Sequence, residues 1–128
     1  MSKKLLMNNA SNQQGTIIPV TLEIPRGYYN GGSGIKASHN YIFGYIATID
    51  PNKKYDLYCK NWNSTNYPET PCTLHISFWD ENYAYIEGQT NARLLYKYSP
   101  PANAKYIRIG HDSRKCSNTG ADLVLIEY

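Results

Sequence analysis

The chain holds few cysteines and no pattern that would give them a shared role. Its three cysteines, Cys59, Cys72 and Cys116, are an odd number without CxxC spacing, so they indicate neither a disulfide framework nor a zinc site. We expect free, buried thiols. Because Cys59 and Cys72 flank one loop, a bridge between them across a hairpin remains the alternative.

Long hydrophobic runs and strong charge are also lacking. No segment approaches the ~20 apolar residues of a membrane-spanning helix, and Leu5-Leu6-Met7 is too short for a signal peptide. We therefore expect a protein that stays in its cell or leaves it by another route, such as inside a virus particle or by lysis. A net charge of +3, with scattered Lys and Arg, argues against a nucleic-acid partner.

Short runs rich in β-branched and aromatic residues fill the chain, which has 13 Tyr and only 2 Phe. Turn signals separate the runs, and no window shows sustained helical spacing of apolar residues. These features predict an all-β domain, an antiparallel, jelly-roll-like β-sandwich of seven or eight strands over residues 16–128. Residues 1–15 are expected to form a polar N-terminal arm. The expected strands cover residues 16–24, 41–49, 55–60, 73–79, 94–98, 105–109 and 123–128.

Alternation along these runs predicts two kinds of strand face. The core faces should carry Tyr55, Leu57, Cys59, Leu74, Ile76, Phe78, Ile107 and Ile109. The opposite faces carry Tyr58, His75, Ser77, Trp79, Tyr106 and Arg108. If the strands are neighbours, this second set forms an exposed stacking surface. The alternative is that a second sheet, a loop or a partner subunit covers it.

Two segments resemble a known family. Residues 76–88 are similar to a recurrent I-x-F-Y-D-x-N-x-x-Y-I-x-G pattern, and residues 100–109 are similar to x-P-A-N-A-x-Y-I-R-I. Both patterns belong to carbohydrate-binding-module-like β-sandwich domains of bacteriophage tail, baseplate and receptor-binding proteins, which this chain resembles. The resemblance covers roughly residues 27–128 and departs from the family at Trp79 and in the loop from Asn61 to Pro71. It implies a sandwich fold and a place on a phage particle.

The first functional hypothesis is a non-catalytic module of the virion that recognises glycans on the host surface. Aromatic rings can stack on sugar faces, and polar side chains can bind hydroxyl groups. The candidate ligand-binding residues lie in the variable loop, on the expected exposed face and at the turn that follows it: Trp62, Tyr67, His75, Trp79, Tyr83 and Tyr85. Arg108 is expected to pair with Asp80 or Glu87.

The alternative is a structural virion protein that decorates a capsid, forms a head fibre or assembles a tail, with the same sandwich forming a homo-oligomer. An enzyme is not expected, because the adjacent residues His111, Asp112 and Ser113 cannot ordinarily align as a triad. No cofactor is predicted. A structural calcium ion stays open, although no segment forms a calcium loop.

Overall fold

The structure, a computed structural model, describes residues 4–6, 14–30, 35–67, 75–90, 92–115 and 123–128. Within these residues no helix occurs, and so none that could cross a membrane. The described strands are β1 (Lys4–Leu6), β2 (Gln14–Ile18), β3 (Thr21–Ile24), β4 (Gly27–Asn30), β5 (Ile35–Ser38), β6 (Ile42–Thr48), β7 (Tyr55–Cys59), β8 (His75–Trp79), β9 (Tyr85–Thr90), β10 (Tyr106–Asp112) and β11 (Leu123–Glu127).

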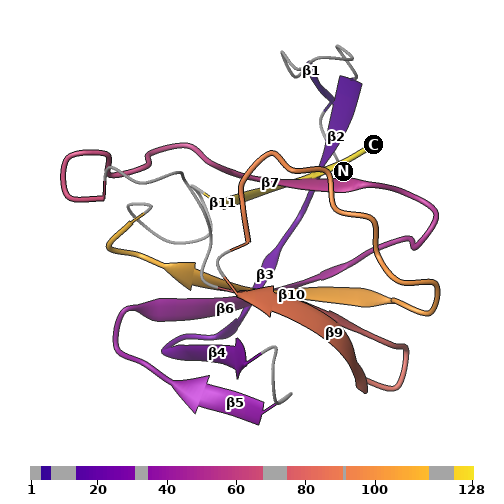
Figure 1. Ribbon diagram of the computed structural model, residues 1–128, viewed down its shortest axis with the longest axis horizontal. Coiled ribbons are helices and arrows are strands. Elements are labelled where there is room, and N and C mark those ends of the chain that lie inside the picture. Colours follow the sequence, from indigo (N-terminus) through magenta and orange to yellow (C-terminus); the bar gives the residue numbers. More distant parts are fainter. Residues whose placement is uncertain (1–3, 7–13, 31–34, 68–74, 91, 116–122) are drawn as a thin grey trace.

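The strands form two sheets and a separate hairpin, and every pairing is antiparallel. One sheet has the order β1-β2-β11-β7 and the other β3-β6-β10-β8-β9. Figure 1 shows β7 and β11 above the five-stranded sheet and the hairpin β4–β5 below it. The predicted all-β antiparallel sandwich is therefore confirmed. Eleven strands occur among the described residues, more than the seven or eight expected.

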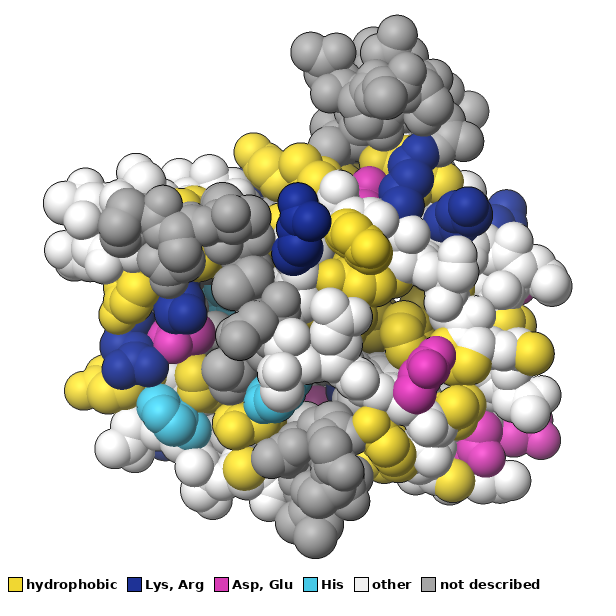
Figure 2. Space-filling model, in the orientation of Figure 1, with side chains coloured by type: hydrophobic (Ala, Val, Ile, Leu, Met, Phe, Trp, Pro, Cys, Tyr) yellow, Lys and Arg dark blue, Asp and Glu magenta, His cyan; other side chains and the backbone are white. Residues whose placement is uncertain are grey.

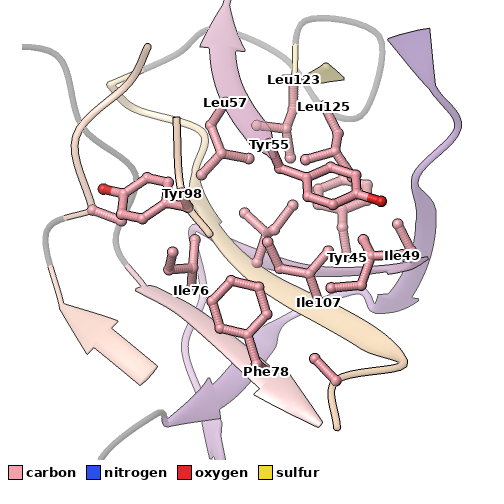
Figure 3. Packing of buried hydrophobic residues seen from close by; sticks show 14 residues of the cluster. Tyr45, Ile49, Tyr55, Leu57, Ile76, Phe78, Tyr98, Ile107, Leu123 and Leu125 are labelled. Carbon is pink, nitrogen blue, oxygen red and sulfur yellow. The ribbon is translucent and has the colours of Figure 1, made fainter. Parts of the chain in front are cut away.

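The core lies between the two sheets. Leu57 and Leu125 from one sheet and Ile107 from the other are fully buried, and Ile76 and Phe78 of β8 pack with them. Figure 3 shows side chains of both sheets converging on this space, including the ring of Tyr55. The core faces predicted by alternation for β7, β8 and β10 are thus correct where the structure describes them; Leu74 lies outside the described residues.

The strand predicted at 105–109 is longer in the structure, as β10 (Tyr106–Asp112), and three other expected segments differ in kind. Residues 16–24 fall into β2 and β3, which belong to different sheets. The break is at Pro19, which has no N–H to donate to a ladder. Residues 94–98 form no strand; only Tyr98 makes an isolated bridge, to Tyr55. The polar segment 1–15 contains β1, which pairs with β2.

A pair of glycines seats the hairpin β4–β5 on the outer face of the five-stranded sheet. Gly44 of β6 and Gly110 of β10 are directly opposite each other in the ladder. A Cβ at Gly44 would lie 3.0 Å from the backbone oxygen of Gly27, and a Cβ at Gly110 would lie 3.1 Å from Cβ of Tyr28. The backbone of β4 can approach the sheet this closely because neither glycine has a side chain.

We therefore expect the Gly44→Ala substitution to lower the free energy of unfolding by about 1–3 kcal/mol, because the added methyl group overpacks against the backbone of β4. Urea denaturation of the variant and the parent measures this change. Gly88→Ala, in the exposed part of β9, is the matched control and should change stability by less than about 0.5 kcal/mol. Equal stability of the Gly44 variant and the control would contradict the close seating of the hairpin.

Candidate functional site

The hairpin β4–β5 covers the face that the sequence predicted to be exposed. Trp79 is 4% exposed and His75 is 6% exposed. The ring of Tyr28 stacks on His75 at 4.7 Å, and the ring of Tyr29 meets Trp79 edge-on at 5.1 Å. The prediction that Trp79 and His75 lie on an open face is wrong, because two rings of the chain itself occupy their surfaces. The alternative, that another sheet covers this face, is correct: the cover is the two-stranded sheet of the hairpin β4–β5.

Arg108 organises the aromatic side chains around Trp79. Its guanidinium makes two hydrogen bonds to the carboxylate of Glu23, at 2.8 and 2.7 Å. It also lies 3.9 Å from the ring centroid of Tyr29, 4.5 Å from that of Trp79 and 5.4 Å from that of Tyr83. The expectation that Arg108 pairs with an acidic residue is correct, but the partner is Glu23 of β3 and neither of the two acids that were expected. Pairing and ring contacts together compensate the burial of the cation.

The turn after β8 presents Tyr83 at the surface. The carboxylate oxygen Oδ1 of Asp80 accepts hydrogen bonds from the backbone N–H groups of Asn82 (2.8 Å) and Ala84 (2.9 Å). Tyr83 has a φ of 60°, a conformation that bulky residues rarely adopt, and it is 52% exposed. Its ring is stacked on that of Tyr106, with centroids 4.5 Å apart and planes 8° from parallel. A hydrogen bond with Tyr106 raises the pKa of the Tyr83 hydroxyl.

A polar hollow adjoins this stacked pair. It has a volume of about 410 Å³ and lies between the turn 80–82 and the segment 102–105. The backbone N–H of Lys105 donates to the carbonyl oxygen of Trp79 (2.8 Å), which holds the two segments side by side. The lining offers carboxylates, amides and an ammonium group: Asp80, Glu81, Asn82, Asn103 and Lys105. Tyr83 and Tyr106 directly follow the lining residues Asn82 and Lys105 in the chain, so the ring pair adjoins the hollow, although neither ring is among its described lining residues. We refer to the two rings and the hollow as the Tyr83 surface.

Trp62 and Tyr67 lie in a different part of the molecule, in the loop after β7. The indole N–H of Trp62 donates to the carbonyl oxygen of Tyr67 (2.9 Å). Trp62 lines a groove of about 500 Å³ at the end of β7, together with residues of the segment 94–95. Cys59, which also lines this groove, is disulfide-bonded, so the expectation of a free thiol is wrong there. The other two cysteines lie outside the described residues.

The residues that resemble a triad only in sequence have structural partners. The carboxylate of Asp112 binds the guanidinium of Arg114 (2.9 Å). Burial alone would raise the pKa of Asp112, but the hydrogen bonds from Arg114 outweigh it and hold the pKa below its usual value. The hydroxyl of Ser113 donates to the carbonyl oxygen of Tyr41 (3.0 Å). In the described part of the chain no three His, Cys, Asp or Glu side chains gather to hold a metal ion.

The six predicted site residues thus fall into three places. Trp79, Tyr83 and Tyr85 come together around Arg108, since the ring of Tyr85 meets Trp79 edge-on at 5.4 Å. Trp62 and Tyr67 form a pair in their loop, and His75 is enclosed under the hairpin. Sequence reasoning missed several contributors to these places: Glu23, Tyr29, Asn103, Lys105, Leu94 and Leu95. Their roles depend on which strands are neighbours, and the alternation of residues along each strand does not show this.

Comparison of the chain with family models, with curated proteins and with solved structures finds no match.

The enclosed His75 predicts that acid weakens the fold. Burial lowers the pKa of His75 below its usual value of about 6.5, and within the described residues its Nδ1 makes no hydrogen bond. Below about pH 6.5 the unfolded chain takes up this proton more readily than the folded chain does, so stability falls with falling pH until the lowered pKa is reached. Above pH 7 the effect is absent.

The variant His75→Gln should lose this component of the pH dependence. Thermal unfolding of the variant and the parent between pH 5 and 7.5 measures it, with His39→Gln, an exposed histidine, as the control. The difference in Tm between pH 7.5 and pH 5 should shrink in the His75 variant and stay unchanged in the control. If the Tm of the parent protein had the same pH dependence as that of the His75 variant, the assignment of this pH dependence to His75 would be refuted.

Proposed function

We propose that this chain is a non-catalytic carbohydrate-binding module of a phage particle that recognises glycans on the host surface through the Tyr83 surface. The observation that carries the proposal is the half-exposed ring of Tyr83, stacked on Tyr106 beside a polar hollow of about 410 Å³. A sugar has an apolar C–H face and a rim of hydroxyl groups. It therefore needs an aromatic ring and polar side chains within one small surface.

The chemistry of the hollow supports a neutral, hydroxyl-rich ligand. Carboxylates accept hydrogen bonds, an ammonium group donates them, and amides do both, so the lining can satisfy hydroxyl groups in either direction. Asp80 has a second role, because its Oδ1 already binds the backbone of the turn. The turn that displays Tyr83 is therefore held in place before a ligand arrives, which reduces the entropy lost on binding.

A binding role without catalysis is supported by the engagement of the acidic and hydroxyl groups elsewhere. Asp112 is bound by Arg114, and Ser113 donates to a backbone carbonyl. The place on a phage particle rests on the resemblance of residues 76–88 and 100–109 to segments of phage sandwich domains. These are the two segments that the Lys105–Trp79 hydrogen bond joins at the hollow.

We expect the variant Tyr83→Gly to lose at least about tenfold in glycan affinity, the effect of about 1.4 kcal/mol of lost ring contact. Glycine adopts a φ of 60° without strain, so relief of strain offsets part of the lost stacking on Tyr106 and the fold should persist. A glycan array selects the ligand, and titration calorimetry then compares the variants. Tyr41→Ala is the matched control, since Tyr41 is 51% exposed and lies outside the hollow.

Unchanged affinity of the Tyr83 variant would remove the Tyr83 surface as the site. A parent protein that binds no glycan and self-associates into a stable ring or trimer would favour the structural virion role. The array and the mass of the protein in solution are therefore measured on the same sample.

A further inference from the structure

The groove beside Trp62 is distinct from the Tyr83 surface. It has a volume of about 500 Å³ and lies where β7 ends, whereas the Tyr83 surface adjoins Lys105, whose carbonyl oxygen binds the backbone N–H of Ile49 ahead of β7. Figure 1 shows the loop after β7 and the turn before β9 on different sides of the sandwich. The lining of the groove beside Trp62 combines rings, aliphatic chains and two polar groups: Tyr58, Lys60, Trp62, Ser64, Leu94 and Leu95.

Both walls of this groove are fixed to the sandwich. On one wall the indole N–H of Trp62 binds the carbonyl oxygen of Tyr67, and the backbone N–H of Asn63 binds the carbonyl oxygen of Lys115 (2.7 Å). On the other wall the backbone N–H of Leu95 binds the carbonyl oxygen of Leu57 (2.9 Å). The rings and aliphatic side chains are therefore arranged in advance of binding, which lowers its entropic cost.

The segment that forms the second wall has an uncommon backbone. Leu95 has a φ of 56° and Lys97 a φ of 55°, the left-handed region that side chains of this size rarely occupy. The buried carboxylate of Asp56 accepts a hydrogen bond from the backbone N–H of Lys97, and so keeps the segment in this shape. As a result Leu95 is 48% exposed at the groove, although an apolar side chain of its size is usually buried.

The charged side chain described in the lining of this groove is positive. Lys60 is the only charged residue among the described lining residues. Arg93 lies beside the second wall, with its guanidinium 5.5 Å from the ring centroid of Tyr96. The ammonium group of Lys115 is 5.6 Å from the ring centroid of Tyr67. The carboxylate of Asp56, on the same strand as Tyr58, is buried and already accepts a hydrogen bond. Figure 2 shows other Lys and Arg side chains in the upper part of the molecule, on the side of β7 and β11.

We propose that the Trp62 groove binds an acidic sugar of the host glycan, with the sugar ring against Trp62 and its carboxylate on Lys60. This inference rests on the proposed function and extends it, because it adds a second subsite and states the charge of its ligand. Trp62 and Tyr58 offer apolar surface to the C–H groups, Ser64 offers a hydroxyl group, and Lys60 pairs with the acid. The Tyr83 surface, with its own carboxylates, takes the neutral part.

The test uses two oligosaccharides that differ only in charge: a uronic-acid oligosaccharide and its carboxyl-reduced analogue. Titration calorimetry at low salt should show the parent protein binding the acidic form at least fivefold more tightly. Lys60→Gln should abolish this preference, and 0.5 M salt should weaken it. Trp62→Ala should lower the affinity for the acidic form at least tenfold. Lys36→Gln, an exposed lysine on β5, is the control and should retain the preference.

The outcomes separate this inference from the proposed function. Equal affinity for both oligosaccharides, or a preference that survives in Lys60→Gln, overturns the acidic subsite. Loss of glycan binding in Tyr83→Gly with no effect of Trp62→Ala keeps the proposed function and also overturns the subsite. A parent protein that binds neither oligosaccharide and no glycan on the array overturns both.

Discussion

The contacts of the Arg108 guanidinium hold together much of the layer outside the five-stranded sheet, which consists of the hairpin β4–β5 and the turn after β8. A cation this deeply buried needs a counter-ion and hydrogen-bond acceptors, and the carboxylate of Glu23 supplies both by accepting two hydrogen bonds. The rings of Tyr29, Trp79 and Tyr83 surround it. One side chain therefore joins β3, the hairpin β4–β5, β8 and the turn that displays the proposed sugar-binding ring. The position of the Tyr83 ring in the Tyr83 surface therefore depends on the contacts that the buried cation of Arg108 requires.

The sandwich separates two surfaces that differ in chemistry. The Tyr83 surface holds carboxylates, amides and a lysine beside a stacked ring pair, which suits hydroxyl groups. Among its described lining residues, the Trp62 groove holds rings and leucines with one lysine, which suits an apolar ring with a negative substituent. Since residues of β7, β8 and β10 pack in one core, both surfaces are fixed to the same sandwich, and the glycan of the proposed function would meet them in a constant geometry.

Alternation along the chain predicted the inward faces of β7, β8 and β10 correctly, because an inward side chain must be apolar whichever strand lies next to it. The same pattern misjudged the other face of β8. Trp79 and His75 look like surface residues in sequence, yet Tyr28 and Tyr29 of a hairpin with no clear alternation cover them. The predicted ion-pair partners of Arg108 were wrong for the same reason. Arg108 pairs with Glu23, which is 85 residues away on a strand whose place in the sheet the sequence does not show.

By itself, the sequence determined the fold class, the core faces and the loop that carries Trp62, because these follow from local composition, periodicity and turn residues. Only the tertiary structure decided that the hairpin rests on Gly44 and Gly110, that Cys59 is disulfide-bonded, and that Tyr83 stacks on Tyr106 beside Lys105. Each of these depends on strand order and register between distant segments. Local sequence patterns do not specify such pairings, because the free energy of pairing is gained only when the sheets pack together.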